Sequence, residues 1–270
     1  MKRALGPAGR AALDECRRRG ALLAFDFDGT LAPIVAVPAR AALRPATRRL
    51  LARLARQQPC LVLSGRSPAD LAGRLRGIPL VERVGNHGAA FALSPAQRAS
   101  ARSRVLRWRQ ALERRLDGRP GLALEDNGVS LAVHYRRARD RAAARRAIVA
   151  AARPLPGART LDGKCVVNVL PAQAAHKGDV LRTIARARRA GCVLYVGDDV
   201  TDESAFRARV APRFMSIRVG RSPRSAAAFA LDGQRQIDAL LRALLGPPSR
   251  RVRTTGRRVS ASSRRARPAP

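Results

Sequence analysis

Five short apolar runs, each followed by a turn or a helix start, constrain the fold of this chain more than any other feature. They lie at residues 21–25, 60–63, 80–84, 193–196 and 214–219. Several are rich in Val and Leu on both faces, which is typical of strands in a parallel sheet covered by helices. A helix is expected after the fourth run, over residues 202–210. This alternation of strands and helices predicts a doubly wound α/β core.

The middle of the chain has a different pattern and predicts an α+β unit. Ser94 and Gln97 have the spacing of a capping box, and an apolar stripe that includes Trp108 follows at helical spacing. Two hairpins and a second helix follow: a hairpin turning at Asn127-Gly128, a helix over residues 140–152, and a hairpin turning at Asp162-Gly163.

These patterns divide the chain into three parts. We expect residues 1–92 and 172–246 to form the α/β core, with residues 93–171 inserted as the α+β unit. Residues 249–270 hold eight arginines and no acid among Ser, Thr, Gly and Pro. Such a segment cannot bury enough apolar surface to fold, so we expect residues 247–270 to be a disordered basic tail.

The net charge of +35 suggests a polyanion as a partner, because counterion release attracts such proteins to nucleic acids. Nearly all of the excess is arginine, however, and it accompanies abundant alanine, as the codon usage of a GC-rich genome would produce. Aromatic residues make up only 3%, which leaves few platforms for stacking bases. We therefore expect no specific nucleic-acid partner.

The apolar runs and the cysteines indicate where such a protein works. No apolar run approaches the roughly 18 residues that a membrane span needs. The first twenty residues lack the continuous apolar stretch of a signal peptide, so we expect a cytoplasmic protein without a membrane partner. The four cysteines form no close pair in the sequence, and we expect Cys60 and Cys192, which open apolar runs, to be buried free thiols. The sequence does not indicate an oligomeric state.

Acidic residues follow the first and fourth runs, where an open α/β sheet places its functional sites. Asp26 and Asp28 end the first run, and the period of an extended chain puts both carboxylates on one side. The fourth run leads into four acids within residues 198–203. Carboxylates this close repel one another, and a divalent cation would relieve that repulsion.

Two other segments carry groups suited to a phosphoryl ligand. Ser64 and Gly65 follow the second run and offer a hydroxyl group and backbone N–H groups. Lys177 precedes a helix start and is one of only three lysines in an arginine-rich chain. A lysine kept in such a chain indicates a site that needs a compact point charge.

These residues, in this order, resemble the four motifs of the haloacid dehalogenase superfamily of phosphatases: Asp26-Phe27-Asp28-Gly29-Thr30, Ser64, Lys177 and Gly197-Asp198-Asp199. Longer strings are similar to those of the trehalose-6-phosphate phosphatases, over about residues 20–240. They include Ser64-Gly65-Arg66, Gly85-Asn86-His87-Gly88-Ala89, and Glu125-Asp126 with His134-Tyr135-Arg136. The resemblance implies a parallel-sheet core of the haloacid dehalogenase type with an inserted α+β cap, acting on a small sugar phosphate.

The resemblance also implies a mechanism. Asp26 would attack phosphorus to form an aspartyl-phosphate, while Asp28 would protonate the leaving sugar and then deprotonate water. Mg²⁺ would lie between the Asp26 carboxylate, the Asp28 backbone carbonyl and Asp198. Ser64, Gly65 and Lys177 would hold the phosphoryl oxygens, with Asp199 and Asp202 orienting Lys177 or the waters of the metal.

The sugar site is expected within the cap. The resemblance implies Glu125, Arg136 and Lys164 as residues that contact trehalose. Asn127 and Asn168 depart from the family, which usually carries a lysine and a glutamate at these positions. The sequence therefore leaves two alternatives to a trehalose 6-phosphate phosphatase: a phosphatase for another sugar phosphate, and a catalytically silent or nucleic-acid-binding protein on the same scaffold.

Overall fold

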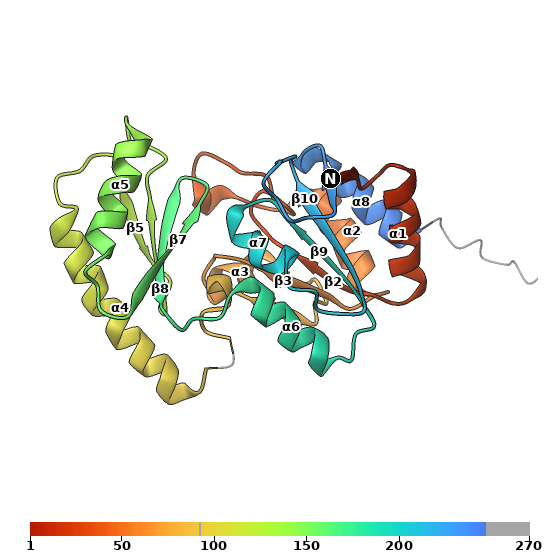
Figure 1. The fold of residues 1–270 in the computed structure, drawn as a ribbon, viewed down its shortest axis with the longest axis horizontal. Coiled ribbons are helices and arrows are strands. Elements are labelled where there is room, and N and C mark those ends of the chain that lie inside the picture. Colours follow the sequence, from red (N-terminus) through yellow and green to blue (C-terminus); the bar gives the residue numbers. More distant parts are fainter. Residues whose placement is uncertain (92, 247–270) are drawn as a thin grey trace, which may run out of the picture.

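A computed structural model describes residues 1–91 and 93–246, so the expected disordered tail at residues 247–270 lies outside the described residues. The described chain forms two sheets, each with its own helices, that lie side by side (Figure 1). Residues of both units line a pocket between them. None of the described helices combines the length and the apolar character needed to cross a bilayer.

The larger sheet has seven strands in the order β1-β11-β10-β9-β2-β3-β4, and its pairings are parallel. All five apolar runs lie in it, as β2 (Leu22–Phe25), β3 (Cys60–Leu63), β4 (Glu82–Val84), β9 (Cys192–Gly197) and β10 (Arg213–Val219). The sequence did not reveal the remaining strands, because they are too short for a periodic pattern: β1 (Lys2–Arg3) and β11 (Phe229–Leu231).

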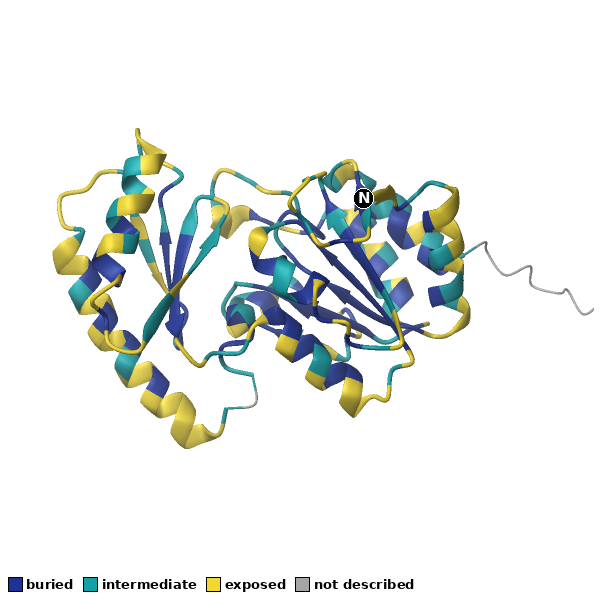
Figure 2. Ribbon diagram, in the orientation of Figure 1, coloured by how far each residue is buried: buried dark blue, intermediate teal, exposed yellow. Residues whose placement is uncertain are grey.

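Helices cover both faces of this sheet, as the apolar runs predicted (Figure 2). Successive side chains of a strand point to opposite faces, so Leu23 and Phe25 pack into one core and Leu22 and Ala24 into the other. The first core includes side chains of α1 (Pro7–Arg18), α2 (Pro45–Ala55), α3 (Pro68–Arg74) and α8 (Ile237–Leu245). The second includes those of α6 (Lys177–Ala187) and α7 (Glu203–Phe206). Single 3₁₀ turns lie in the connections: η1 (Pro38–Arg40), η2 (Asn86–Gly88), η3 (Val200–Asp202) and η4 (Gln234–Gln236).

The smaller sheet is antiparallel, with the order β5-β6-β8-β7. Its elements occupy one continuous stretch of the chain: α4 (Pro95–Arg115), β5 (Ala123–Asp126), β6 (Leu131–His134), α5 (Arg141–Ala152), β7 (Ala158–Gly163) and β8 (Val166–Pro171). The expected capping box of Ser94 and Gln97 opens α4, and Trp108 is buried in the core beneath it. Both helices pack on the face of this sheet that is turned away from the larger sheet (Figure 1).

Three local expectations were wrong. The first hairpin turns through residues 127–130 rather than at Asn127-Gly128 alone, because Asn127 is buried at the cleft instead of exposed in a tight turn. The second turns at Lys164-Cys165, two residues later than expected, with Cys165 in a left-handed conformation (φ 62°). The helix expected over residues 202–210 is only α7, and Arg209, three residues after its end, has a left-handed conformation (φ 40°) that a helix does not contain.

The cysteines are free, and Cys60 and Cys192 are buried as expected. Cys16 on α1 and Cys192 on β9 lie next to each other, with 3.5 Å between their sulfur atoms. Because 176 residues separate the two cysteines in the chain, the sequence did not predict that they are neighbours.

Candidate active site

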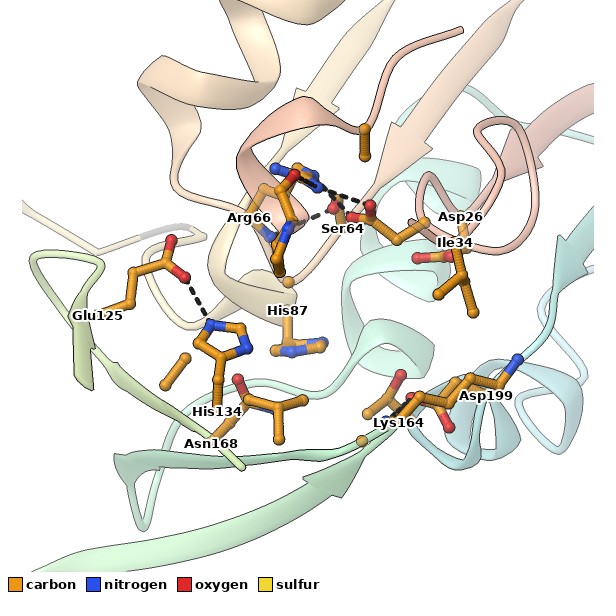
Figure 3. Close-up of a pocket in the computed structure, with 18 of the residues that line it drawn as sticks. Asp26, Ile34, Ser64, Arg66, His87, Glu125, His134, Lys164, Asn168 and Asp199 are labelled. Carbon is orange, nitrogen blue, oxygen red and sulfur yellow. Dashed lines mark hydrogen bonds and ion pairs between the residues drawn. The ribbon is translucent and has the colours of Figure 1, made fainter. Parts of the chain in front are cut away.

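A pocket opens between the carboxyl ends of the core strands and the uncovered face of the smaller sheet (Figure 3). Every site residue predicted from the sequence lines it except Asp202, which lies directly beneath. From the core come Asp26, Asp28, Ser64, Gly65, Lys177, Asp198 and Asp199; from the smaller unit come Glu125, Arg136 and Lys164.

Asp26 and Lys177 form a buried ion pair at the centre of this pocket. Asp26 directly follows β2, and its backbone N–H donates to Val196 on the neighbouring β9 at 2.8 Å. Lys177 opens α6 and places its Nζ 2.7 Å from Asp26 Oδ1 and 2.7 Å from Asp202 Oδ1. Burial disfavours the charged ammonium, but the two carboxylates outweigh it and raise the pKa of Lys177. The pair therefore keeps a fixed positive charge beside Asp26.

Asp202 holds this lysine in place. Its Oδ1 accepts from Lys177 and from the hydroxyl of Tyr195 (2.6 Å), and its Oδ2 accepts from the backbone N–H groups of Asp198 and Asp199 (2.9 Å each). Burial acts to raise the pKa of Asp202, but Lys177 and these donors lower it. Both oxygens are thus engaged, and Asp202 lies where it orients Lys177.

The acids of the pocket can accommodate a hard cation. Asp26, Asp198 and Asp202 each offer an oxygen within 4.8 Å of the other two. Burial, together with the charges of Asp202 and Asp198, raises the pKa of Asp26, against the effect of Lys177. Burial and neighbouring carboxylates likewise raise the pKa of Asp198 to about 6, against Lys164. Because Asp202 is fully hydrogen-bonded, Asp26 and Asp198 are the carboxylates that fit a magnesium ion.

The turn after Asp28 allows these acids to lie close together. Gly29 has φ 85°, a left-handed conformation that favours glycine. A Cβ at this position would also collide with the carboxylate of Asp198. Position 29 therefore accepts only glycine while Asp198 stays where it is.

Ser64 and Gly65 lie at the end of β3, where the backbone turns beneath the pocket. The N–H of Ser64 donates to Val84 at 2.9 Å, and the N–H of His87 donates to the Ser64 carbonyl at 2.8 Å. The His87 ring packs so closely on Gly65 that a Cβ there would lie 2.5 Å from its Nε2. Burial, reinforced by Lys177, lowers the pKa of His87 to about 3, so this ring is neutral.

Asp28 is paired with Arg66, which the sequence did not indicate as a site residue. Arg66 donates from Nε to Asp28 Oδ2 and from Nη2 to Asp28 Oδ1, both at 2.7 Å. The sequence could have indicated Arg66, because it belongs to the Ser64-Gly65-Arg66 motif and lies two residues after Ser64, which directly follows β3.

The three residues expected to contact sugar line the pocket, but each also contacts protein. The ammonium of Lys164 lies against Asp198, and its backbone N–H donates to Asp199 Oδ2 at 3.1 Å. Arg136 donates to the backbone carbonyls of Val35 (3.1 Å) and Lys164 (3.2 Å). Glu125 Oε2 lies 2.7 Å from Nε2 of His134, a pocket residue that the site predictions omitted. The interaction with His134 lowers the pKa of Glu125 against burial.

Asn127 and Asn168, the two departures from the family pattern, also line the pocket. The backbone carbonyl of Asn127 accepts from Asn86 Nδ2 at 2.8 Å, and Asn168 Nδ2 donates to the carbonyl of Leu161 at 3.2 Å. The buried Asn127 Oδ1 and His87 Nδ1 have no hydrogen-bond partner among the described residues.

Comparisons with known proteins agree with this geometry. The trehalose-phosphate phosphatase of Mycobacterium marinum is 36% identical to this chain over 248 residues. The match covers 87% of this chain and 60% of that protein, so the chain spans about 60% of the length of this relative.

Two solved structures show the fold. The C-terminal domain of trehalose-6-phosphate phosphatase from C. albicans is similar with a TM-score of 0.70 and 22% identity, covering 90% of this chain and 98% of that one. A phosphatase of the haloalkanoate (HAD) enzyme superfamily from Bacteroides thetaiotaomicron is similar with a TM-score of 0.53 and 16% identity, covering 82% and 92%. The predicted fold class, an α/β core with the fold of the haloacid dehalogenase type and an inserted α+β unit, is confirmed.

The family model for trehalose-phosphatase matches residues 24–234. This range includes the core sheet from the end of β2 to β11, the whole smaller unit and every predicted site residue. The chain therefore belongs to the trehalose-phosphatase family, as its motifs predicted.

Proposed function

We propose that this chain is a magnesium-dependent phosphatase that hydrolyses trehalose 6-phosphate to trehalose and phosphate. The observation that carries the proposal is the Lys177 ammonium fixed 2.7 Å from Asp26 in a pocket that Ser64 and Asp198 also line. A carboxylate beside a fixed cation and a strand-end hydroxyl is suited to accept a phosphoryl group. The family and its relatives supply the substrate class.

In the first half of the reaction, a carboxylate oxygen of Asp26 forms a bond to phosphorus while the bond from phosphorus to the sugar oxygen breaks. Asp28 gives its proton to that sugar oxygen. In the second half, Asp28 takes a proton from water as the water oxygen bonds to phosphorus. The bond to Asp26 then breaks, and phosphate and the starting enzyme result.

The remaining groups stabilise charge. Ser64, the backbone N–H of Gly65, and Lys177 bind the phosphoryl oxygens, while Asp202 holds Lys177 in position. Asp26, Asp198 and the backbone carbonyl of Asp28 would hold Mg²⁺, which neutralises phosphoryl charge when bound.

The inserted unit, residues 93–171, acts as a cap that closes over the sugar and excludes water. Two of its residues already contact the core: Lys164 at Asp198, and Arg136 at the carbonyl of Val35. Glu125, Arg136 and Lys164 bind sugar hydroxyl groups once these contacts rearrange around substrate.

One observation favours a second candidate, a phosphatase for a different sugar phosphate. Asn127 and Asn168 replace charged groups at the sugar site, and Asn127 Oδ1 is unpaired among the described residues. Phosphate release from trehalose, glucose and sucrose 6-phosphates, measured with Mg²⁺ and with a chelator, tests both. We expect a preference for trehalose 6-phosphate that disappears with the chelator and returns with Mg²⁺. A preference for another sugar phosphate would contradict the substrate alone, and activity in the chelator would contradict the metal.

Asp26→Asn tests the covalent mechanism, since an amide neither attacks phosphorus nor binds Mg²⁺ well. We expect no turnover from this variant. Asp232→Asn, which removes an exposed carboxylate paired with Arg221, is the matched control and should remain active. Substantial turnover by Asp26→Asn would eliminate the aspartyl-phosphate.

A further inference from the structure

Arg66 binds both carboxylate oxygens of Asp28, each at 2.7 Å, with the two arms of its guanidinium group. This fork is the strongest and most directional contact a carboxylate makes with a side chain. The Asp28 side chain is 38% exposed, so without the fork little would restrict its rotation. Because proton transfer needs the carboxyl within hydrogen-bond reach of the leaving oxygen, the orientation of Asp28 affects the rate.

Arg66 is itself held rigidly. Its Nη1 donates to Asp70 Oδ2 at 2.7 Å, and its Nη2 also donates to the Pro38 carbonyl at 2.9 Å. The guanidinium lies 5.4 Å from the ring centroid of Phe27, and its side chain is only 12% exposed. Asp70 is fixed in turn by Arg74, and its backbone N–H donates to the hydroxyl of Ser67, which caps α3.

These contacts use most of the donors of Arg66. A guanidinium carries five N–H groups. Four hydrogen bonds from Arg66 go to protein acceptors: two to Asp28, one to Asp70 and one to Pro38. Few donors remain for a phosphoryl group or a sugar, so the effect of Arg66 on the reaction passes through Asp28.

We infer that Arg66 is a positioning residue that orients the Asp28 carboxyl for proton transfer to the leaving sugar oxygen. The inference rests on the proposed function. It distinguishes Arg66 from Ser64 and Lys177, which act on the phosphoryl oxygens themselves.

The dependence of the rate on the leaving group tests this role. A sugar alkoxide leaves slowly unless it is protonated, whereas p-nitrophenolate leaves without a proton. The value of kcat/KM reports only the steps up to phosphoryl transfer to Asp26, before water is deprotonated. For Arg66→Met, which keeps the apolar stem over Phe27, we expect kcat/KM for trehalose 6-phosphate to fall about tenfold to a hundredfold. The value for p-nitrophenyl phosphate should fall less than about threefold, since that reaction bypasses the proton of Asp28.

A double-mutant cycle then separates an effect through Asp28 from direct contact with substrate. In the Asp28→Asn background, adding Arg66→Met should cause almost no further loss with the sugar phosphate. Arg66→Lys, which keeps the charge but not the fork, should show the same selective loss if Arg66→Met folds poorly. Arg109→Met removes an i,i+4 ion pair with Glu113 on the far helix of the smaller unit and is the control expected to match wild type.

The outcomes distinguish this inference from the proposed function. Equal losses on both substrates, or a full additional loss in the Asp28→Asn background, would overturn the positioning role while the phosphatase assignment stands. If wild type prefers another sugar phosphate, the same ratio is measured with that substrate. A wild-type protein that hydrolyses neither kind of substrate would overturn the proposed function and this inference together.

Discussion

The ammonium of Lys164, on the second hairpin of the smaller unit, lies against the carboxylate of Asp198 at the end of β9. From the sequence, Lys164 was expected to contact the sugar and Asp198 to bind the metal. Because both a lysine and a metal ion would neutralise the same carboxylate, the two compete for Asp198. The contact also ties the smaller unit to the core.

Removing this lysine should therefore strengthen metal binding. For Lys164→Met we expect the dissociation constant of Mg²⁺ to fall roughly twofold to fivefold, the range of a partly exposed ion pair. Isothermal titration calorimetry on the metal-free protein measures it without turnover. Lys2→Met, at an exposed strand on the far edge of the core sheet, is the control and should bind Mg²⁺ like wild type. Weaker binding by Lys164→Met would show that Lys164 supports the metal instead of competing with it.

Lys177 should contribute strongly to stability as well as to chemistry. Its ammonium is the shared partner of the buried Asp26 and Asp202, so Lys177→Met leaves two carboxylates without their cation. Removing one partner of a buried ion pair costs about 3–5 kcal/mol. Denaturant unfolding should show a loss of this size, while Lys2→Met should change stability little. A loss below about 1 kcal/mol, the range of surface pairs, would contradict the buried network.

Metal binding should weaken in acid. Burial raises the pKa of Asp198 to about 6, so the metal-free protein keeps a proton on this carboxyl until the pH exceeds that value. Mg²⁺ must displace the proton below about pH 6, and its apparent affinity should fall about tenfold for each pH unit there. Calorimetric titrations at several pH values, which also detect proton release, check this, and an affinity independent of pH would contradict it.

The sugar site can be tested by the selectivity of variants. Losing a charged hydrogen bond to a hydroxyl group costs about 1.5–3 kcal/mol, or roughly tenfold to a hundredfold in rate. Glu125→Ala should therefore slow hydrolysis of trehalose 6-phosphate by that factor and leave a small aryl phosphate nearly unaffected. Equal losses on both substrates would show that Glu125 acts in the chemistry common to both and not in binding the sugar.

The two asparagines decide how closely the chain follows its family. If they substitute for the usual charged pair, wild type will still prefer trehalose 6-phosphate over glucose 6-phosphate. If that preference is absent and Asn127→Lys with Asn168→Glu creates it, the substrate assignment is wrong while the enzyme class remains.

Local patterns in the sequence predicted much of this molecule. The five adjacent strands from β10 to β4, the capping box at Ser94, and the acids after β2 and β9 follow from hydrophobic runs and from side-chain chemistry a few residues away. Errors arose where tertiary contacts overrode local preference, as at Asn127, which packs at the cleft instead of serving as an exposed turn residue. Strands β1 and β11 were missed because two or three residues carry no period.

The sequence alone determined the fold class, the family and the residues that could do chemistry, because each depends on the order and type of nearby residues. Only the tertiary structure decided which of these residues meet. Lys177 pairs with Asp26 across 151 residues and Arg66 with Asp28 across 38, while Lys164 meets Asp198 only because the smaller unit folds back onto the core. Such pairings depend on how distant elements pack, and no local spacing encodes that packing.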